Sequence, residues 1–370
     1  MSPTSSETYS TDNPIRDKEL DAFQRYPFSK RIAETIAQRK DSLSLVLGIF
    51  GAWGEGKSTV LNFIDEELKQ KEKILLLRFN PWRYREEDTL IKNFFQKISV
   101  LLGKELPSKV EKVTKLFKMY GQVSLLGVDF GKIGKNLADV DLEKLKERVS
   151  GFIEESGKRL VILIDDIDRL DKQEIYSLLK LVRLNADFKN TTYVLSFDQE
   201  MVSSAIGERF GAGDKKAGEN FLEKIIQVPL PIPKAHSESL RRFCSERIEN
   251  SMRKSAISLS KEEKERFDYQ FRTNILIRLR TPRLAIRYSN ILSFSLPLLK
   301  GEVNIVDLML IEALRVFYPD HYSFVKNNPD YFTHIDSDFN SEEQFRNSTK
   351  VDLIKKHLKQ VSLPYNLASF

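Results

Sequence analysis

Short apolar runs with little polar alternation recur between residues 43 and 230, and longer segments of helical periodicity separate them. Runs of this kind, rich in aliphatic and β-branched residues, are typical of strands buried on both faces of a sheet. Strands that alternate with helices predict a parallel sheet covered by helices on both sides. The five runs are LSLVLGIF (43–50), KILLLRF (73–79), VILI (161–164), TTYVLSF (191–197) and KIIQVPL (224–230).

The pattern changes at about residue 236, after which helical periodicity dominates. We therefore predict an α/β domain over residues 13–235, with a helical insertion at about 103–140, and a C-terminal α-helical domain over 236–370. The polar, Ser/Thr-rich start is typical of a disordered tail over residues 1–12 rather than of a secretion signal. The predicted helices of the second domain are SESLRRFCSERIENSM, KEEKERFDYQFRTNILIRL, PRLAIRYSNILSFSL, NIVDLMLIEALRVFY and STKVDLIKKHLKQV.

The composition fits a soluble globular protein, because 370 residues with 41% hydrophobic and 30% charged content can bury the core of one large or two ordinary domains. The single cysteine, Cys244, cannot form an intrachain disulfide, and the four histidines are too scattered for a metal site. No stretch approaches the roughly 18 apolar residues of a membrane-spanning helix, so we expect a cytoplasmic protein without a transmembrane segment. The net charge of +6 permits contact with nucleic acid or an anionic membrane surface but requires neither.

A glycine-rich segment follows the first apolar run and precedes an amphipathic helix. Its sequence, GAWGEGKS (51–58), matches the pattern GxxxxGK followed by Ser or Thr. Such a loop binds phosphate because successive backbone N–H groups point inward, which requires glycine dihedrals, and because the helix N-terminus adds partial positive charge. The competing interpretation is an accidental glycine turn, and the flanking strand and helix argue against it. The predicted nucleotide-binding residues of the loop are Gly51, Ala52, Trp53, Gly54, Glu55, Gly56, Lys57, Ser58 and Thr59.

Within this loop we expect Lys57 to reach the β- and γ-phosphates and the Ser58 hydroxyl to bind Mg²⁺. Two carboxylates, Asp165 and Asp166, follow the apolar run at 161–164. A buried parallel strand delivers such side chains to the ligand crevice at its carboxyl end. Asp165 is then expected to hold magnesium through water and Asp166 to polarise an attacking water. For Asp168 and Asp171, farther along ILIDDIDRLD, the alternative role is a helix cap.

The chain resembles the KAP family of P-loop NTPases. The segments FNPWRY, ILIDDIDRL, YVLSFDQEMVSSAI, FLEKIIQVPLPIP and TPRLAIRY occur in the family's order, within a stretch from about residue 13 to 292. The resemblance implies an ATP-binding and ATP-hydrolysing core of the additional-strand class, with relatives in phage exclusion and in signalling scaffolds at membranes. Many members insert transmembrane helices between the two nucleotide motifs. Here Lys and Gly interrupt the corresponding region, about 103–140, so we predict a soluble member, whose insertion could still meet a membrane surface or a partner.

The resemblance gives the same roles to Lys57, Ser58, Asp165 and Asp166. It places Asp168 and Arg169 in the tail of the acidic motif, where we expect them to shape the loop by an ion pair or a cap. For Arg169 the alternative is contact with a neighbouring subunit.

Other residues near these motifs have two interpretations each. Ser196 or Asp198, at the end of the strand expected between the two nucleotide strands, could sense the γ-phosphate through a water or could cap a helix. Trp53 and Trp82 could stack on a ligand, although core or lid packing is the commoner role of tryptophan. Arg25, at the start of RYPF (25–28), is predicted to belong to a lead-in segment that covers the adenine base.

The predicted helical domain carries a stretch without acidic residues between Asp268 and Glu302. An arginine from such a domain commonly closes on the γ-phosphate, and we choose Arg283, which follows Thr281 and Pro282 at a predicted helix start. A solvated basic face and contact with nucleic acid are the alternatives. Arg209 and Lys224 are further candidates for an arginine-finger role. The recurring arginines are Arg272, Arg278, Arg280, Arg283 and Arg287.

The two nucleotide motifs predict Mg²⁺-dependent ATP binding and hydrolysis that drives a conformational or assembly switch. The resemblance implies that this switch acts in bacterial phage defence or signalling. The expected partner is a second copy of the chain or a protein effector. The preference for ATP over GTP rests on the resemblance alone. The competing functions are a nucleotide-gated scaffold with little turnover and a nucleic-acid-stimulated NTPase; a metabolite kinase fits least, because adjacent carboxylates suit water activation.

Overall fold

The computed structural model describes the whole chain except residues 1–11, 85–86, 119–141, 209–214, 330–331 and 333–370. Residues 1–11 of the predicted tail, most of the predicted insertion, Arg209 and the last predicted helix lie outside the described residues. The rest divides into two compact units: Pro14–Lys234, and Ala235 onward together with Asp12 and Asn13. None of the described helices is both long and apolar enough to cross a membrane.

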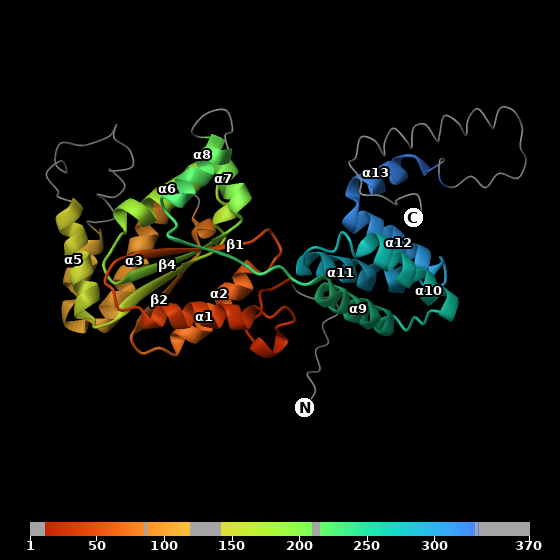
Figure 1. Cartoon of the computed structure of the whole chain (residues 1–370), viewed down its shortest axis with the longest axis horizontal. Helices are drawn as coiled ribbons and strands as arrows, with labels where there is room; N and C mark the ends of the chain where they lie inside the picture. Colours follow the sequence, from red (N-terminus) through yellow and green to blue (C-terminus); the bar gives the residue numbers. More distant parts are fainter. Residues whose placement is uncertain (1–11, 85–86, 119–141, 209–214, 330–331, 333–370) are drawn as a thin grey trace, which may run out of the picture. The chain divides into compact units, whose positions relative to one another are not determined.

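The first unit is built on a parallel sheet of five strands, as predicted (Figure 1). The strand order is β2-β3-β4-β1-β5, and every neighbouring pair is parallel. Strand β4 therefore lies between β1, which leads into the glycine loop, and β3, which carries the acidic pair. This arrangement confirms the additional-strand α/β core. The strands are β1 (Leu45–Phe50), β2 (Ile74–Phe79), β3 (Arg159–Ile164), β4 (Thr191–Phe197) and β5 (Val228–Pro231).

The last strand begins later than the predicted 224–230. A helix ends at Glu223, and the amides of Ile225 and Ile226 both donate to the carbonyl of Leu222, so this segment turns instead of extending. The strand then pairs with β1 alone, at the edge of the sheet. Its prolines, which lack an N–H, are tolerated at such an edge.

Helices cover both faces of the sheet (Figure 1). On one face, α1 and α2 pack Ile36, Leu61 and Ile64 against Ile49 and Val194. The larger core on the other face includes residues of α3, α6 and α7. The helices of this unit are α1 (Arg25–Gln38), α2 (Lys57–Lys69), α3 (Glu87–Glu105), a segment at 110–118, α5 (Leu142–Glu155), α6 (Lys172–Lys180), α7 (Gln199–Gly207) and α8 (Lys215–Glu223), with 3₁₀ turns η1 (Lys18–Leu20), η2 (Pro81–Arg83), η3 (Pro107–Lys109) and η4 (Ile167–Arg169) and the π-helical turn η5 (Leu181–Asn185).

Two helices of the first unit approach very closely. A Cβ placed on Gly218 of α8 would lie 1.9 Å from the carbonyl oxygen of Ser203 and 3.0 Å from the nitrogen of Gly207, both on α7. Only glycine allows the two backbones this separation.

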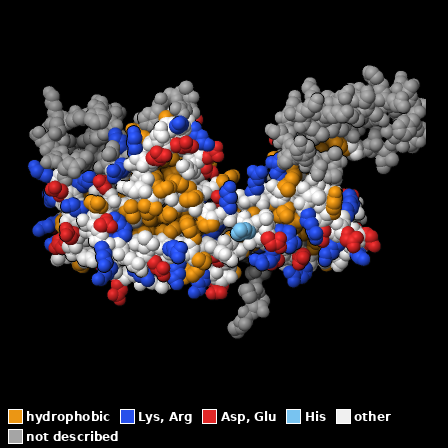
Figure 2. Space-filling model, viewed as in Figure 1, with side chains coloured by type: hydrophobic (Ala, Val, Ile, Leu, Met, Phe, Trp, Pro, Cys, Tyr) orange, Lys and Arg blue, Asp and Glu red, His pale blue; other side chains and the backbone are white. Residues whose placement is uncertain are grey.

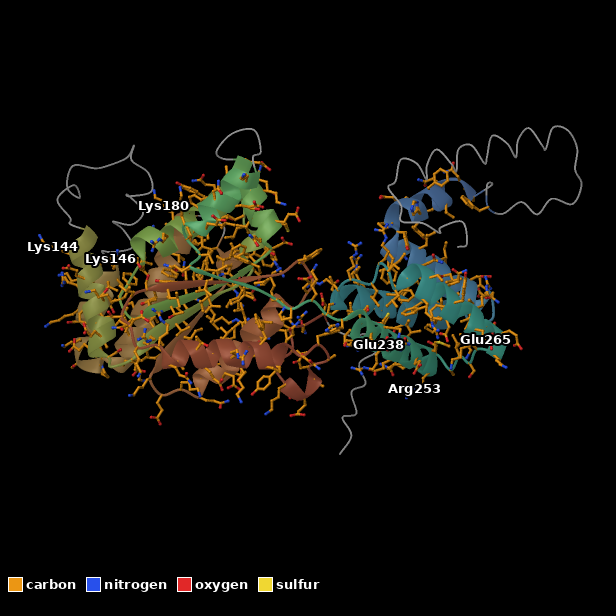
Figure 3. The ribbon with its side chains drawn as sticks, viewed as in Figure 1. Lys144, Lys146, Lys180, Glu238, Arg253 and Glu265 are labelled. Atoms are coloured by element: carbon orange, nitrogen blue, oxygen red, sulfur yellow. The ribbon has the colours of Figure 1, made fainter. Side chains whose placement is uncertain are left out.

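The second unit is helical throughout its described residues, with α9 (Ser237–Lys254), α10 (Lys261–Gln270), the π-helical turn η7 (Phe271–Ile275), α11 (Pro282–Leu299), α12 (Ile305–Phe317) and α13 (Pro319–Asn327). Figure 3 marks Glu238 in the first turn of α9 and Arg253 in its last turn. An acidic residue at the start and a basic residue at the end of a helix interact favourably with the helix dipole. The core includes Tyr288, whose hydroxyl donates to the Met309 carbonyl at 2.8 Å. Cys244 is fully buried there, and burial raises the pKa of its thiol to about 12.

Candidate functional site

The glycine loop joins β1 to α2 in a conformation that requires glycine. Gly54 and Gly56 have φ angles of 90° and 95°, in the left-handed region. The loop is braced from inside, because the carboxylate of Glu55 accepts the Ala52 N–H at 2.8 Å and the Glu55 N–H donates to the Ala52 carbonyl at 3.2 Å. Several amides of the loop and the first helical turn have no protein acceptor in the part of the chain that is described: Gly54, Gly56, Lys57, Ser58 and Thr59. Such a set of N–H groups is what a phosphate chain requires.

The side chain of Lys57 lies under this loop, and the residue as a whole is 8% exposed. Its Nζ donates to the carbonyls of Gly51 at 2.9 Å and Ala52 at 3.4 Å. It also forms an ion pair with Oδ2 of Asp168 at 3.1 Å. Lys57 therefore lies within the loop as predicted from the motif, and its contact with phosphate stays a prediction.

The carboxylate of Asp165 is buried, at 6% exposure, beside the first turn of α2. Burial, and then the neighbouring carboxylate of Asp166, raise the pKa of Asp165; a hydrogen bond with Ser58 and the guanidinium of Arg78 act in the opposite direction. The closest Arg78 nitrogen is 3.6 Å from Oδ2 of Asp165. A carboxylate with so little compensating charge favours a cation beside it.

The residues at this position fit a magnesium ion. Mg²⁺ takes oxygen ligands and is commonly held by one or two protein groups together with water and phosphate oxygens. Ser58 and Asp165 supply two such oxygens, and the Ser58 side chain is one of the groups that act to lower the pKa of Asp165. Across the described ranges, no cluster of three or more His, Cys, Asp or Glu side chains could hold a metal ion.

Asp166 takes a left-handed backbone conformation, with φ 60°, that is uncommon for residues other than glycine. Its Oδ2 accepts a hydrogen bond from Asn80 Nδ2 at 2.7 Å, and its Oδ1 pairs with Nε of Arg169 at 2.8 Å. Arg169 in turn stacks over the ring of Trp82 at 4.7 Å. The second acid is thus held in place from both sides.

Ser196 lies on β4 between the two nucleotide strands. It pairs in register with Ile49 of β1, and the register of Leu195 with Ile164 places Asp165 beside it on the other side. Ser196 is fully buried, yet its Oγ has no hydrogen-bond partner among the described residues. A buried hydroxyl at this position is available to a ligand or a water.

Asp198, the alternative to Ser196, caps α7. Its Oδ1 accepts the N–H groups of Glu200 at 3.0 Å and Met201 at 3.3 Å. The cap expected as one interpretation is therefore present, and contact of Asp198 with nucleotide stays a prediction.

Arg25 is buried and contacts the backbone of the phosphate loop. It is 3% exposed, its Nη2 donates to the Glu55 carbonyl at 3.2 Å, and its Nη1 donates to the Pro233 carbonyl. Burial lowers the pKa of its guanidinium. These contacts give Arg25 a structural part in the loop, and its predicted contact with adenine is untested.

The two tryptophans are at the surface rather than in a core. Trp53, in the loop, is 64% exposed, and Trp82 is 55% exposed. Arg283 lies in the second unit, in the first turn of α11, and pairs with Asp12 of the same unit. Its approach to the nucleotide remains a prediction.

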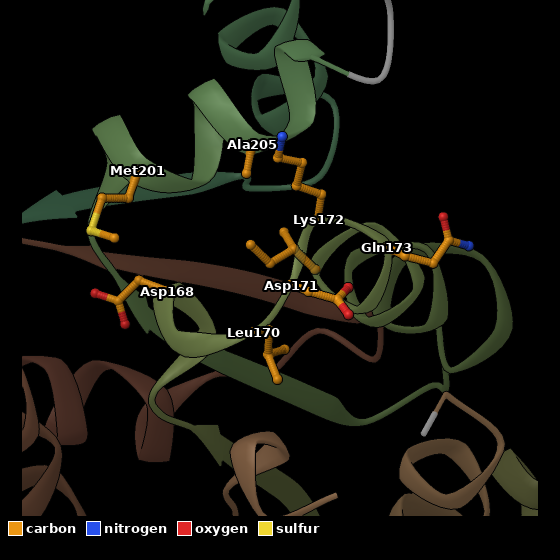
Figure 4. Close-up of a pocket in the computed structure, with 8 residues that line it drawn as sticks. Asp168, Leu170, Asp171, Lys172, Gln173, Met201 and Ala205 are labelled. Carbon is orange, nitrogen blue, oxygen red and sulfur yellow. The ribbon is translucent and has the colours of Figure 1, made fainter. Parts of the chain in front are cut away.

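An open groove of about 560 Å³ lies between the acidic loop and α7 (Figure 4). Four of its eight lining residues are apolar, and hydrophobic atoms gather on the face of this unit that Figure 2 shows. Asp168 stands at the end of the groove beside Met201. The lining residues are Asp168, Leu170, Asp171, Lys172, Gln173, Ile175, Met201 and Ala205.

Sequence reasoning missed the contact that Asp168 makes. We expected this residue to shape its own loop, whereas it pairs with Lys57 across the site. Arg78 and Asn80, which touch Asp165 and Asp166, were not predicted either. The available signal was position, because Arg78 lies near the end of β2 and Asn80 directly follows it, and β2 neighbours the acidic strand β3.

The chain is 26% identical over 351 residues to the phage T7 exclusion protein of Escherichia coli (strain K12), covering 82% of this chain and 46% of that protein. It thus spans about half the length of this curated relative. Among solved structures it is similar to the Aeropyrum pernix ORC2 protein in its ADP form (TM-score 0.39, 12% identity, 96% of this chain and 88% of that one) and to a Thermotoga maritima RuvB mutant (TM-score 0.36, 15% identity, 82% and 73%). Scores of this size are distant likenesses.

The model of the KAP family P-loop domain matches residues 25–299, which is most of the chain and includes both nucleotide motifs. The chain belongs to the KAP family of P-loop NTPases.

Proposed function

We propose that this protein binds ATP with Mg²⁺ and hydrolyses it to ADP and phosphate, using the cycle to switch its conformation or assembly. One observation carries the proposal. The loop with its unengaged amides, the buried Lys57 and the acid Asp165 come together at the carboxyl edge of one sheet. This is the position at which parallel α/β sheets bind ligands.

In this proposal the loop amides and Lys57 hold the phosphate chain. Each N–H or ammonium contact with a phosphate oxygen is a charge-assisted hydrogen bond, worth about 1.5–3 kcal/mol. Ser58 and Asp165 would hold the magnesium ion, which neutralises phosphate charge when bound. Ser196 would bond a water or a γ-phosphate oxygen, and its buried hydroxyl, which has no hydrogen-bond partner among the described residues, supports this role.

Asp166 is the proposed general base. Its carboxylate would take a proton from the water that attacks the γ-phosphorus, while the bond from that phosphorus to the bridging oxygen breaks and ADP leaves. Asn80 and Arg169 fix the orientation of the carboxylate. A fixed base avoids reorganisation during the reaction.

A specific observation also favours the second candidate, a nucleotide-gated scaffold with little turnover. Both oxygens of Asp166 are engaged, one by Asn80 and one by Arg169. A base in this arrangement has less capacity to accept a proton until one partner moves. Low basal turnover that rises with a partner or with self-assembly fits this geometry.

The biological role that we propose is exclusion of phage, supported by the similarity to the phage T7 exclusion protein. Because the chain spans only part of that protein, the effector and the partner are part of the proposal. A second copy of the chain or a protein effector comes first, and nucleic acid at the arginine-containing helical unit comes second. We propose a cytoplasmic location.

The first test measures phosphate release from MgATP by the purified chain and by Asp166→Asn, at two protein concentrations and with or without DNA. Asparagine tolerates the left-handed backbone, so the fold should persist. We expect nucleotide binding to remain and turnover to fall by roughly 10²- to 10⁴-fold, the usual share of a general base. Phage plating on cells that carry each variant should show exclusion by the native chain only.

The matched control is Asp171→Asn, in the same acidic loop. Asp171 caps α6, and asparagine caps a helix about as well. Equal turnover in the native chain and in Asp166→Asn would refute the base assignment. Bound ATP without turnover under any condition would favour the scaffold.

A further inference from the structure

We infer that Asp168 is a latch on Lys57: a positioning residue that competes with the nucleotide phosphates for the ammonium group, and whose release alters the start of α7. The inference rests on the proposed function of the phosphate loop. It concerns a residue that acts through Lys57 and needs no contact of its own with the nucleotide.

The ammonium group has three N–H donors, and the structure offers three acceptors. These are the carbonyl oxygens of Gly51 and Ala52, and Oδ2 of Asp168. The donors are thus fully used in this state, and a phosphate can take one only by displacing an acceptor. Of the three, Asp168 alone carries a full negative charge.

Burial makes this competition strong. The side chains of Lys57 and Asp168 are 9% and 8% exposed, so water screens the pair weakly. A carboxylate held this close to Lys57 also repels the incoming phosphate oxygens. The two anions cannot both take the same position, and Asp168 must yield when the nucleotide engages Lys57.

The other end of the contact is α7. The same oxygen of Asp168 accepts the N–H of Asp198 at 3.2 Å, and Asp198 is the cap of that helix. The groove between the acidic loop and α7 ends at Asp168, beside Met201 (Figure 4). A displaced Asp168 would therefore change the first turn of α7 and one wall of the groove. Nucleotide binding at the phosphate loop would in this way alter the surface of the protein at the groove.

The test compares nucleotide affinity in Asp168→Asn and in the control Asp171→Asn, by calorimetric titration with MgADP and with a non-hydrolysable ATP analogue. Asparagine keeps an acceptor for the Asp198 N–H but removes the charge that holds Lys57. We expect Asp168→Asn to bind about tenfold more tightly than the native chain, a gain of about 1.4 kcal/mol, and the control to be unchanged. A merely structural role would not tighten binding, so equal or weaker binding by Asp168→Asn overturns the latch.

A second measurement uses no nucleotide. A double-mutant cycle of Lys57→Met and Asp168→Asn, followed by urea unfolding, should show that the two changes are not additive. Additive effects would mean that the ion pair contributes nothing and would also overturn the latch. If Asp168→Asn does not fold, Asp168→Ser, which is neutral and smaller, replaces it in both measurements.

The two hypotheses fail differently. Equal affinity in the native chain and Asp168→Asn removes the latch and leaves the proposed function standing. Binding by Asp168→Asn where the native chain binds nothing supports both. Absence of binding in every variant removes the proposed function, and the competition for Lys57 with it, even where the double-mutant cycle shows the ion pair.

Discussion

Asp165 carries a charge that its surroundings disfavour. It is buried next to a second carboxylate, and these two causes, burial first, raise its pKa above the ordinary value of 3.8. A carboxyl whose pKa is raised by folding binds its proton more tightly in the folded state. Its ionised form therefore lowers stability as the pH rises above 3.8 and through the raised pKa. The loss of stability arises because the site holds a carboxylate whose charge a bound cation would compensate.

We accordingly expect Asp165→Asn to be more stable than the native chain near neutral pH, in chelator and without nucleotide. The difference in the free energy of unfolding between the two proteins should shrink as the pH falls toward 3.8. At that pH the carboxyl group of Asp165 in the folded protein is protonated and is therefore neutral, as asparagine is. Urea unfolding at several pH values measures it, with Asp171→Asn as the control. A native chain that is the more stable one at neutral pH would show that the contacts of Asp165 with Ser58 and Arg78 outweigh its burial.

Helices α7 and α8 depend on a residue that has no side chain. A methyl group on Gly218 would meet the backbone of α7 at Ser203, at a distance no real Cβ shows. Backbone atoms cannot rotate aside as a flexible side chain can. Asp168 of the acidic loop contacts Asp198, the cap of α7. The packing of α8 against α7 therefore also affects the acidic loop.

Gly218→Ala should lower the free energy of unfolding by about 1–3 kcal/mol, the usual cost of overpacking, despite the better helix propensity of alanine. The matched control is Gly151→Ala in α5, where nothing lies within 4 Å of the added methyl group. That variant should gain up to about 1 kcal/mol. Midpoints of urea unfolding compare the two, and equal midpoints would mean that α8 moves away from α7 at little cost.

At the scale of the whole molecule, the sequence predicts the sheet and the two nucleotide motifs well. Apolar runs and glycine spacing are local signals, so the strands, the loop at 51–56 and the acids Asp165 and Asp166 could be placed without coordinates. The contact between Asp168 and Lys57 could not, because it depends on how the η4 turn lies against the loop from another strand. The roles of Ser196 and Asp198 were left open for a similar reason, since a hydroxyl or a carboxylate at the end of a strand is both a candidate ligand and a candidate helix cap.

The wrong start of β5 has a different cause. Residues 224–227 have the apolar character of a strand, but two of them use their amides to close the end of α8. Tertiary packing of Ile225 and Ile226 into the larger core then accounts for their hydrophobicity. Apolar character predicted burial correctly at these positions and predicted extension wrongly.

Cys244 gives the second unit a built-in chemical probe of its own opening. Its thiol is the only one in the chain, is fully buried, and has a pKa near 12, so a thiol-directed reagent finds almost no thiolate in the folded protein. Labelling at neutral pH then requires that the helices around it separate, and its rate reports the free energy of that opening. Because the first unit contains no cysteine, the same reagent, added with and without nucleotide, would show whether events at the phosphate loop loosen or tighten helices that belong to the other unit.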